Sequence, residues 1–142
     1  QTTTDLLEMD TENAFKAHAE WSPRLTAPYC VKADEELVER IGFDMVKGIT
    51  IAAPGFYGPQ GRYVRAKLAF PHLNEKVMSF KYKGDVITNF EMESSMVAGL
   101  GKLLGHKAMT VCAIIAGRVS KNMNTNYKGS IEGLVEKVLE RI

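Results

Sequence analysis

The residues best suited to chemistry are two carboxylates, Glu91 and Glu93, which stand on either side of Met92 in the segment NFEMES at residues 89–94. Side chains two apart on a strand point the same way, so both carboxylates can face one crevice. A carboxylate accepts charge-assisted hydrogen bonds, for example from the 2′- and 3′-hydroxyls of a ribose. Alternatively, one glutamate stabilises the positive end of the following helix, worth about 0.3–1 kcal/mol. Spacing alone leaves both interpretations open.

A second candidate is the turn-rich loop GFYGPQGR at residues 55–62. The Gln60 amide both donates and accepts, and the Arg62 guanidinium only donates. Together they match the O2/N3/O4 edge of uracil, and Phe56 and Tyr57 supply rings to pack on a heterocycle. An ordinary solvated surface turn is the alternative. By itself Met92 is more typical of a core residue than of a ligand contact.

The composition excludes several classes of protein. Lys and Arg total 18 against 17 for Asp and Glu, which is not the basic field of a nucleic-acid-binding protein. The longest apolar run, at 108–116, is too short to span a bilayer. A chain of 142 residues with 45% apolar and 25% charged residues is typical of a globular protein. We expect neither a nucleic-acid nor a membrane partner.

Histidines and cysteines carry little chemistry here. His18, His72 and His106 have no ligand-like spacing, and Cys30 and Cys112 fit no metal or redox motif. We therefore expect no metal site. Thiols without a disulfide framework favour a reducing compartment, so a cytoplasmic location is expected.

The chain reads as one continuous unit, residues 1–142, with an α/β layer architecture. The patterns predict helices over 5–20, 34–40, 94–105 and 130–142, and strands over 46–53, 77–82, 85–90 and 108–116. The run 108–116 is the clearest buried strand, and 120–129 is a polar loop and candidate lid. Ser130 is expected to cap the last helix. The helix from Ser94 is expected to bury Val97, Leu100 and Leu104. Ligands in such folds bind at the carboxyl ends of strands, where both informative segments fall.

Three segments, taken together and in order, resemble motifs of the uridine phosphorylases of the nucleoside phosphorylase family. They are GFYGPQGR at 55–62, NFEMES at 89–94 and VCAIIAGR at 111–118. The resemblance implies a three-layer fold with a mixed β-sheet flanked by helices, of which this chain covers about the C-terminal half. It also implies the reversible reaction of uridine with phosphate to give uracil and ribose 1-phosphate.

The resemblance also implies roles for single residues. Gln60 and Arg62 would hold the uracil edge, and Phe56 would pack on the base. Residues of the third motif would complete the base pocket: Ile114 and Ile115 as its apolar wall and Arg118 near O4. Gly117 stands where the pyrimidine enzymes commonly have asparagine. The purine members and the nucleosidases resemble one another in an aspartate after this same strand, which this sequence lacks, and this favours a pyrimidine.

For the sugar, the resemblance implies that Glu93 binds the ribose hydroxyls, with Met92 against the ring and Glu91 in support. Arg62 and Glu93 would be the catalytic residues. No cofactor is implied, because inorganic phosphate is the co-substrate.

The phosphate-binding residues are expected in the N-terminal half of the family's chain, which has no counterpart here. Association with that half and a homo-oligomer, a dimer or hexamer, are expected. Two other functions remain open. One is a nucleosidase of the same fold, which uses water instead of phosphate, and the other is a non-catalytic nucleoside- or nucleobase-binding module.

Overall fold

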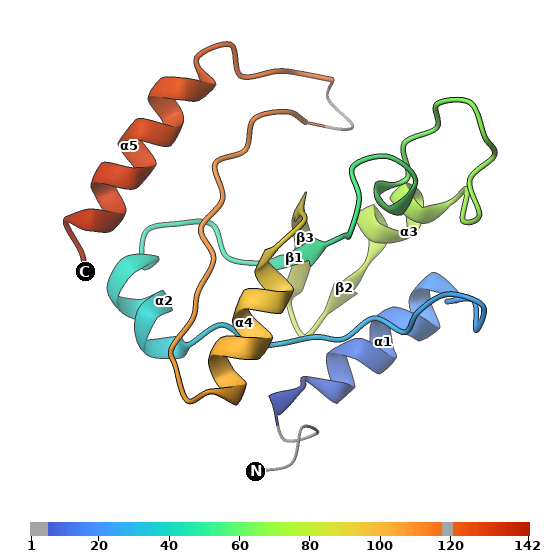
Figure 1. The fold of residues 1–142 in the computed structure, drawn as a ribbon, viewed down its shortest axis with the longest axis horizontal. Helices are drawn as coiled ribbons and strands as arrows, with labels where there is room; N and C mark the ends of the chain where they lie inside the picture. Colours follow the sequence, from blue (N-terminus) through green and yellow to red (C-terminus); the bar gives the residue numbers. More distant parts are fainter. Residues whose placement is uncertain (1–5, 118–120) are drawn as a thin grey trace. The chain divides into compact units, whose positions relative to one another are not determined.

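The computed structural model describes residues 6–117 and 121–142 (Figure 1). The chain divides into two compact units: unit 1, residues 1–32 and 47–108, and unit 2, residues 33–46 and 109–142. The prediction of one continuous unit stays a prediction. The helices and strands are α1 (Met9–Ala19), α2 (Glu35–Ile41), β1 (Ile49–Ala52), the 3₁₀ turn η2 (Gly58–Gln60), α3 (Leu73–Ser79), β2 (Lys81–Tyr82), β3 (Asp85–Glu91), α4 (Ser94–Leu103) and α5 (Tyr127–Leu139).

Unit 1 contains a three-stranded mixed sheet with the order β1-β3-β2. β1 and β3 are parallel, and β2 pairs antiparallel with β3 across a turn at Lys83 and Gly84. Both turn residues have positive φ, 50° and 93°, the conformation of a tight hairpin turn that suits glycine. The predicted strand over 85–90 and its turn are confirmed. The expected fold class, a mixed sheet flanked by helices, is confirmed as well.

β1 is shorter than the predicted strand over 46–53. Val46 lies outside β1 and is 92% exposed. Gly48 comes so close to β3 that a Cβ there would lie 2.4 Å from Thr88 Cγ2. The pairing register with β3 then shifts between Ile49 and Thr50. An irregularity of this kind bends and twists a strand, and the regular part of the ladder runs from Thr50 to Ala52.

The core of unit 1 lies between α1 and α3. Phe15 on α1 meets Phe80 edge-on at 5.3 Å between ring centroids, and Phe80 is only 2% exposed. Leu73 and Val77 on α3 are also buried. The predicted strand over 77–82 is wrong for residues 77–79, which belong to α3; only residues 81 and 82 form a strand, β2. The buried positions recur at helical spacing, four and then three residues apart, so a helix is what buries them together.

The outward face of α4 is apolar, contrary to expectation. Val97, Leu100 and Leu104 were expected to be buried, but they are 57%, 51% and 68% exposed. Met96 and Leu103 extend the same stripe and are 59% and 53% exposed. The helix itself is confirmed, and its opposite side contacts β1. A helix buries its apolar face only where another element covers it, and the described residues of unit 1 do not cover this one.

In unit 2, α2 forms as predicted. The Asp34 side chain accepts a hydrogen bond from the Leu37 amide at 3.1 Å, and Gly42 ends the helix. The buried strand predicted over 108–116 is wrong. In the described part of unit 2, this run makes one isolated bridge, from Ala116 to Met123. A strand needs a neighbouring strand with which to exchange backbone hydrogen bonds, and no described strand pairs with this run.

The last helix begins three residues earlier than predicted. α5 starts at Tyr127, and Ser130 lies within its first turn instead of capping it. The Ser130 hydroxyl donates to the Asn126 carbonyl at 3.3 Å and accepts from the Asn124 amide at 2.8 Å. Serine inside a helix commonly donates such a hydrogen bond to the carbonyl four residues earlier. Ser130 therefore indicated the first turn of the helix correctly, but not the residue at which the helix begins.

The two helices of unit 2 are joined by ion pairs at Asp44. Its carboxylate accepts from both terminal nitrogens of Arg141, at 2.7 and 2.9 Å, and from Lys137 at 3.1 Å. The Arg141 guanidinium also lies over the Phe43 ring, 4.4 Å from its centroid. The hydrogen bond from Arg141, and next that from Lys137, hold the pKa of Asp44 well below its usual value of 3.8.

Asp44→Asn is expected to lower the stability of unit 2 at neutral pH but not in acid. A lowered folded-state pKa means that the ionised carboxylate stabilises the fold above about pH 3.8, and that this contribution is lost as the pH falls towards the folded-state pKa. The difference in urea midpoint between wild type and variant should therefore shrink below pH 4. Glu132→Gln, at an exposed position of α5, is the control. A difference that persists unchanged at pH 2 would contradict the ion-pair explanation.

Candidate active site

The two candidate loops leave the sheet at the same edge. β1 and β3 are adjacent and parallel, with Ala52 opposite Glu91. The ladder continues one step further, because the Ala53 amide donates to the Glu91 carbonyl at 2.9 Å. The segment that contains Phe56 to Arg62 therefore begins beside the segment that contains Glu91 to Glu93. The predicted placement of both at the carboxyl ends of strands is confirmed, and this edge is where open α/β sheets bind ligands.

The loop after β1 folds around the backbone carbonyl of Tyr57. The amides of Gln60 and Arg62 both donate to this oxygen, at 3.0 and 2.9 Å. Gly61 ends the η2 turn with φ +68°, a left-handed conformation that glycine adopts without strain. The loop is thus a defined turn and not an irregular excursion.

Within this turn the Arg62 guanidinium is held from two sides. Its Nη1 donates to the Phe56 carbonyl and to Gln60 Oε1, both at 2.5 Å. The guanidinium carbon also lies 3.7 Å from the centroid of the Phe56 ring, in cation–π geometry. Both hydrogen bonds use Nη1, and these contacts leave the donors on Nε and Nη2 for a ligand. The structure brings Phe56, Gln60 and Arg62 together, as the sequence predicts for a base site.

Gln60 is more deeply buried than its expected role suggests. Only 3% of this residue is exposed, whereas the neighbouring Phe56 ring is 51% exposed. In this conformation the Gln60 carbonyl oxygen orients Arg62. An amide oxygen has two lone pairs, so it can accept from Arg62 and from a second donor at once.

The Glu91 side chain, at the end of β3, binds the backbone at the start of α4. Its Oε2 accepts from the backbone amides of Glu93 and Ser94 at 2.8 and 2.7 Å, and its Oε1 accepts from the Ser94 hydroxyl at 2.5 Å. Partial burial of this carboxyl opposes its ionisation, but the hydrogen bonds from Ser94 and from the amides of Glu93, Ser94 and Met92 prevail and lower its pKa below 4.5. Glu91 therefore caps the helix.

Glu91→Gln is expected to destabilise the protein by about 0.5–1 kcal/mol at pH 7, a capping loss at the low end of the usual range because the carboxyl is partly solvent-screened. Since the folded-state pKa is lowered, the stabilisation is present above about pH 4.5 and disappears as the pH falls further. Urea titrations at pH 7 and pH 3 test this. An equal destabilisation at both pH values would argue against an ionised cap.

Glu93 faces a different environment from Glu91. It is exposed, and its Oε2 accepts one long hydrogen bond, 3.3 Å, from the Met92 amide. Met92 is itself 44% exposed and does not belong to the core. The pair of glutamates thus divides into a capping carboxylate and an exposed one at the strand end. The exposed carboxylate, that of Glu93, makes no capping hydrogen bond to α4.

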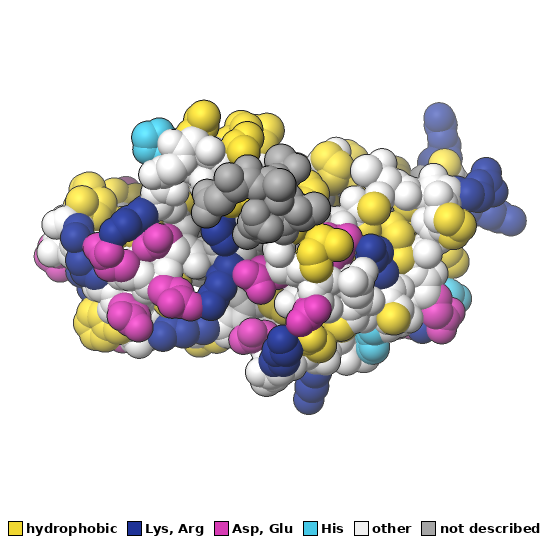
Figure 2. Space-filling view, turned by 90° about the horizontal axis from the view of Figure 1, so that it is seen from below, with side chains coloured by type: hydrophobic (Ala, Val, Ile, Leu, Met, Phe, Trp, Pro, Cys, Tyr) yellow, Lys and Arg dark blue, Asp and Glu magenta, His cyan; other side chains and the backbone are white. Residues whose placement is uncertain are grey.

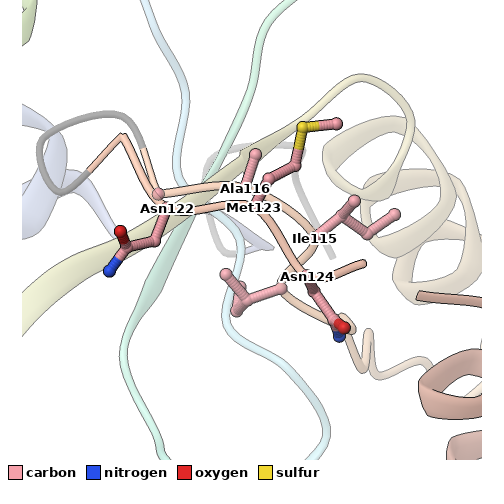
Figure 3. Close-up of a pocket in the computed structure, with 7 residues that line it drawn as sticks. Ile115, Ala116, Asn122, Met123 and Asn124 are labelled. Carbon is pink, nitrogen blue, oxygen red and sulfur yellow. The ribbon is translucent and has the colours of Figure 1, made fainter. Parts of the chain in front are cut away.

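The predicted apolar wall lies in unit 2. Ile114 and Ile115 line an open cavity of about 350 Å³ together with Ala116, Gly117, Asn122, Met123 and Asn124. Ala116 and Met123, the bridged pair, project to the same side of the two chain segments in Figure 3. Arg118, assigned to the O4 side of the base, lies outside the described residues.

Asn124 is one residue of this region that sequence reasoning did not single out. Its amide nitrogen donates to Ser130, and its side-chain oxygen accepts from the Asn126 amide at 2.9 Å. Its backbone amide donates to the Ile115 carbonyl at 2.7 Å. The only available signal was the asparagine-rich composition of residues 122–126, which indicated a loop but no particular contact.

Residues 6–117 and 121–142 contain neither a metal-binding cluster nor a membrane-spanning helix. No group of three or more His, Cys, Asp or Glu side chains is arranged to hold a metal ion. Within the same ranges, every helix is too short or too polar to cross a bilayer.

The family model described as "Phosphorylase superfamily" matches residues 3–141. The chain belongs to the phosphorylase superfamily. This phosphorylase-superfamily chain is 34% identical, over 91 residues, to a curated uridine phosphorylase of Thermococcus kodakarensis. That match covers 60% of this chain and 30% of the relative. The expected resemblance to nucleoside phosphorylases is confirmed.

A solved structure gives the same result for the fold of this superfamily member. The crystal structure of a Trypanosoma brucei nucleoside phosphorylase, described as showing uridine phosphorylase activity, matches with a TM-score of 0.63 and 27% identity. The match covers 93% of this chain and 40% of that one. The chain therefore spans about a third of the length of the relatives it matches, and its fold is part of the nucleoside phosphorylase fold.

Proposed function

We propose that this chain is part of a uridine phosphorylase, which cleaves uridine with inorganic phosphate. A phosphate oxygen bonds to C1′ of the ribose as the C1′–N1 bond breaks, and the bonding electron pair leaves with uracil. The products are ribose 1-phosphate and uracil. One observation supports this above all others: Arg62 is held against the Phe56 ring and the Gln60 amide, at the strand edge that also bears Glu93.

Arg62 would act on the leaving base. As the glycosidic bond breaks, negative charge spreads onto the O2 and O4 carbonyls of uracil, so no acid is needed to protonate a ring nitrogen. A guanidinium aimed at a carbonyl binds the transition state more strongly than the substrate, because the charge on that oxygen grows during the reaction. The cation–π contact and the two hydrogen bonds fix its direction beforehand.

Glu93 would act on the sugar. Its exposed carboxylate is suited to accept hydrogen bonds from the 2′- and 3′-hydroxyls, and such charge-assisted bonds are about twice as strong as neutral ones. Met92 would lie against the sugar ring. Glu91 would support the pair indirectly, since it fixes the start of α4. Ile114, Ile115 and Arg118 are also proposed as base contacts, on the resemblance of their motif.

The phosphate-binding residues are proposed to lie in polypeptide beyond these 142 residues. The matched relatives are much longer than this chain. The exposed apolar stripe of α4 agrees with this proposal, because exposed apolar patches are typical of surfaces that bind another polypeptide, among other partners. Inorganic phosphate is the proposed co-substrate, and no cofactor is proposed. The remaining part of the family's chain and further copies, as a dimer or hexamer, are the proposed protein partners.

The charge pattern supports small molecules as ligands. On the face drawn in Figure 2, acidic and basic side chains are interspersed with hydrophobic ones. This mixed surface differs from the one-signed field that attracts nucleic acid or an anionic membrane. A cytoplasmic location is part of the proposal, because the spacing of the two cysteines matches no disulfide framework and thiols favour a reducing compartment.

The decisive experiment measures uracil release from uridine by the purified protein, with and without inorganic phosphate. Release that requires phosphate, with ribose 1-phosphate as the second product, supports the proposal. Equal release in phosphate-free buffer would show a nucleosidase. Uridine or uracil binding without release in either buffer, even in the complete polypeptide that carries the phosphate-binding residues, would show a non-catalytic binding module.

A further inference from the structure

The geometry points to Asn74 on α3 as a positioning residue for the base-binding loop, an inference that rests on the proposed function. Asn74 lies 12 residues after Arg62 in the sequence and belongs to no motif named above. Its side-chain amide donates to the Gly61 carbonyl at 3.1 Å. Gly61 is the residue between Gln60 and Arg62, so this hydrogen bond holds the backbone from which both proposed base contacts extend.

The approach of Asn74 to this loop is close. A Cβ at Gly61 would lie 2.9 Å from both the nitrogen and the oxygen of the Asn74 amide. With φ at +68°, Gly61 also has a conformation that residues with side chains rarely adopt. Glycine therefore serves two purposes here: it allows the left-handed turn, and it leaves the space that the Asn74 amide occupies.

The element that carries Asn74 is well anchored. Leu73 and Val77, on the same helix, are 7% and 4% exposed, and Phe80 directly after the helix is 2% exposed. The hydrogen bonds described above for the loop after β1 are local ones, within residues 56–62. Asn74 connects this local turn to the packed core between α1 and α3. A rigid scaffold that fixes a loop in this way fixes the direction of its functional side chains.

A positioning role makes a selective prediction. Without the Asn74 amide, the turn keeps its internal hydrogen bonds but loses one attachment to the core, so Gln60 and Arg62 meet the uracil edge less often in the correct orientation. The sugar contact at Glu93 belongs to β3 and α4 and does not depend on this loop. Uracil binding should therefore weaken while ribose 1-phosphate binding stays the same.

Two variants and a matched control test this. Asn74→Ala removes the donor and volume, Asn74→Asp keeps the size but replaces the donor by a carboxylate, and Glu75→Ala changes the adjacent exposed position of α3. Calorimetry should show uracil affinity about tenfold weaker in both Asn74 variants, as expected for one lost hydrogen bond, and unchanged in the control. Ribose 1-phosphate affinity should stay within twofold in all three.

Hydrogen exchange in the ligand-free protein provides a readout that does not depend on the proposed ligand. Exchange of the amides at residues 57–62 should accelerate in both Asn74 variants and not in Glu75→Ala. Unchanged exchange, unchanged uracil affinity, or an equal loss for uracil and ribose 1-phosphate would overturn the positioning role. If the wild-type protein binds no uracil but the Asn74 variants still show faster loop exchange, the proposed function is overturned. Asn74 then remains the residue that holds the loop.

Discussion

Arg62→Ala should lower kcat for uridine phosphorolysis by about 10²- to 10³-fold, a loss of about 2–4 kcal/mol of transition-state stabilisation. The reason is geometric: the guanidinium is fixed by Phe56 and Gln60 in one orientation, next to the proposed position of the base. Because charge grows on the uracil carbonyl only during bond cleavage, the loss should appear mainly in kcat and less in KM. Steady-state kinetics over a range of uridine and phosphate concentrations measures both.

Two further variants make this prediction specific. Arg62→Lys keeps the positive charge but has neither the planar fork nor the ring stacking of a guanidinium, so it should recover only a small part of the activity. Arg65→Ala removes an exposed arginine three residues away and should leave kcat within twofold of wild type. If Arg62→Ala itself stays within twofold of wild type, Arg62 has no role in the chemical step.

Glu93→Gln should raise KM for uridine by about 10- to 100-fold and spare the affinity for free uracil. The exposed carboxylate would lose its charge, and hydrogen bonds to a charged acceptor contribute about 1.5–3 kcal/mol. Uracil lacks the sugar, so its binding does not depend on this residue. Calorimetry with uracil and with ribose 1-phosphate separates the two halves of the substrate.

Glu91→Gln is the matched control for this second prediction, because it makes the same chemical change two residues earlier. The Glu91 carboxylate is occupied by the start of α4, whereas that of Glu93 is exposed. Glu93→Gln should therefore impair ribose binding with little loss of stability, whereas the main effect of Glu91→Gln should be a loss of stability. Weakened uracil binding in Glu93→Gln would place that residue at the base instead.

Local patterns predicted the local structure well. The predicted helices over 5–20 and 34–40 and the predicted strand over 85–90 depend on interactions within a few residues. All three form, as α1 (Met9–Ala19), α2 (Glu35–Ile41) and β3 (Asp85–Glu91). The strand predicted over 77–82 failed for a related reason. The same residues also fit a helical spacing, and the burial of Val77 and the packing of Phe80 against Phe15 of α1 favour the helix.

Patterns that depend on distant partners predicted less. The run 108–116 has the composition of a buried strand, but residue types cannot say whether a neighbouring strand is present to pair with it. For the same reason, the apolar spacing of α4 predicts that one face of the helix is buried, but it does not identify the element that packs on this face. Within the part of the chain that the structure describes, the apolar stripe of α4 is exposed and the run 108–116 is half-buried or exposed, not buried.

The candidate site shows a similar division between identity and geometry. The sequence identifies Gln60, Arg62 and the two glutamates as unusual residues, and parallel pairing of β1 and β3 confirms that their segments leave one sheet edge. The different roles of Glu91 and Glu93 did not follow from a spacing that treats the two alike. Nor did the contact from Asn74, because it joins two segments only after the backbone has folded.

The contacts of Arg62 also have an entropic consequence. A free arginine side chain has about 2 kcal/mol of rotamer entropy, which an enzyme loses when the side chain becomes fixed on a substrate. Here the ring of Phe56, its carbonyl and the Gln60 amide already fix the guanidinium in the protein without ligand. That loss of freedom therefore occurs during folding, and binding of the proposed nucleoside would avoid most of it.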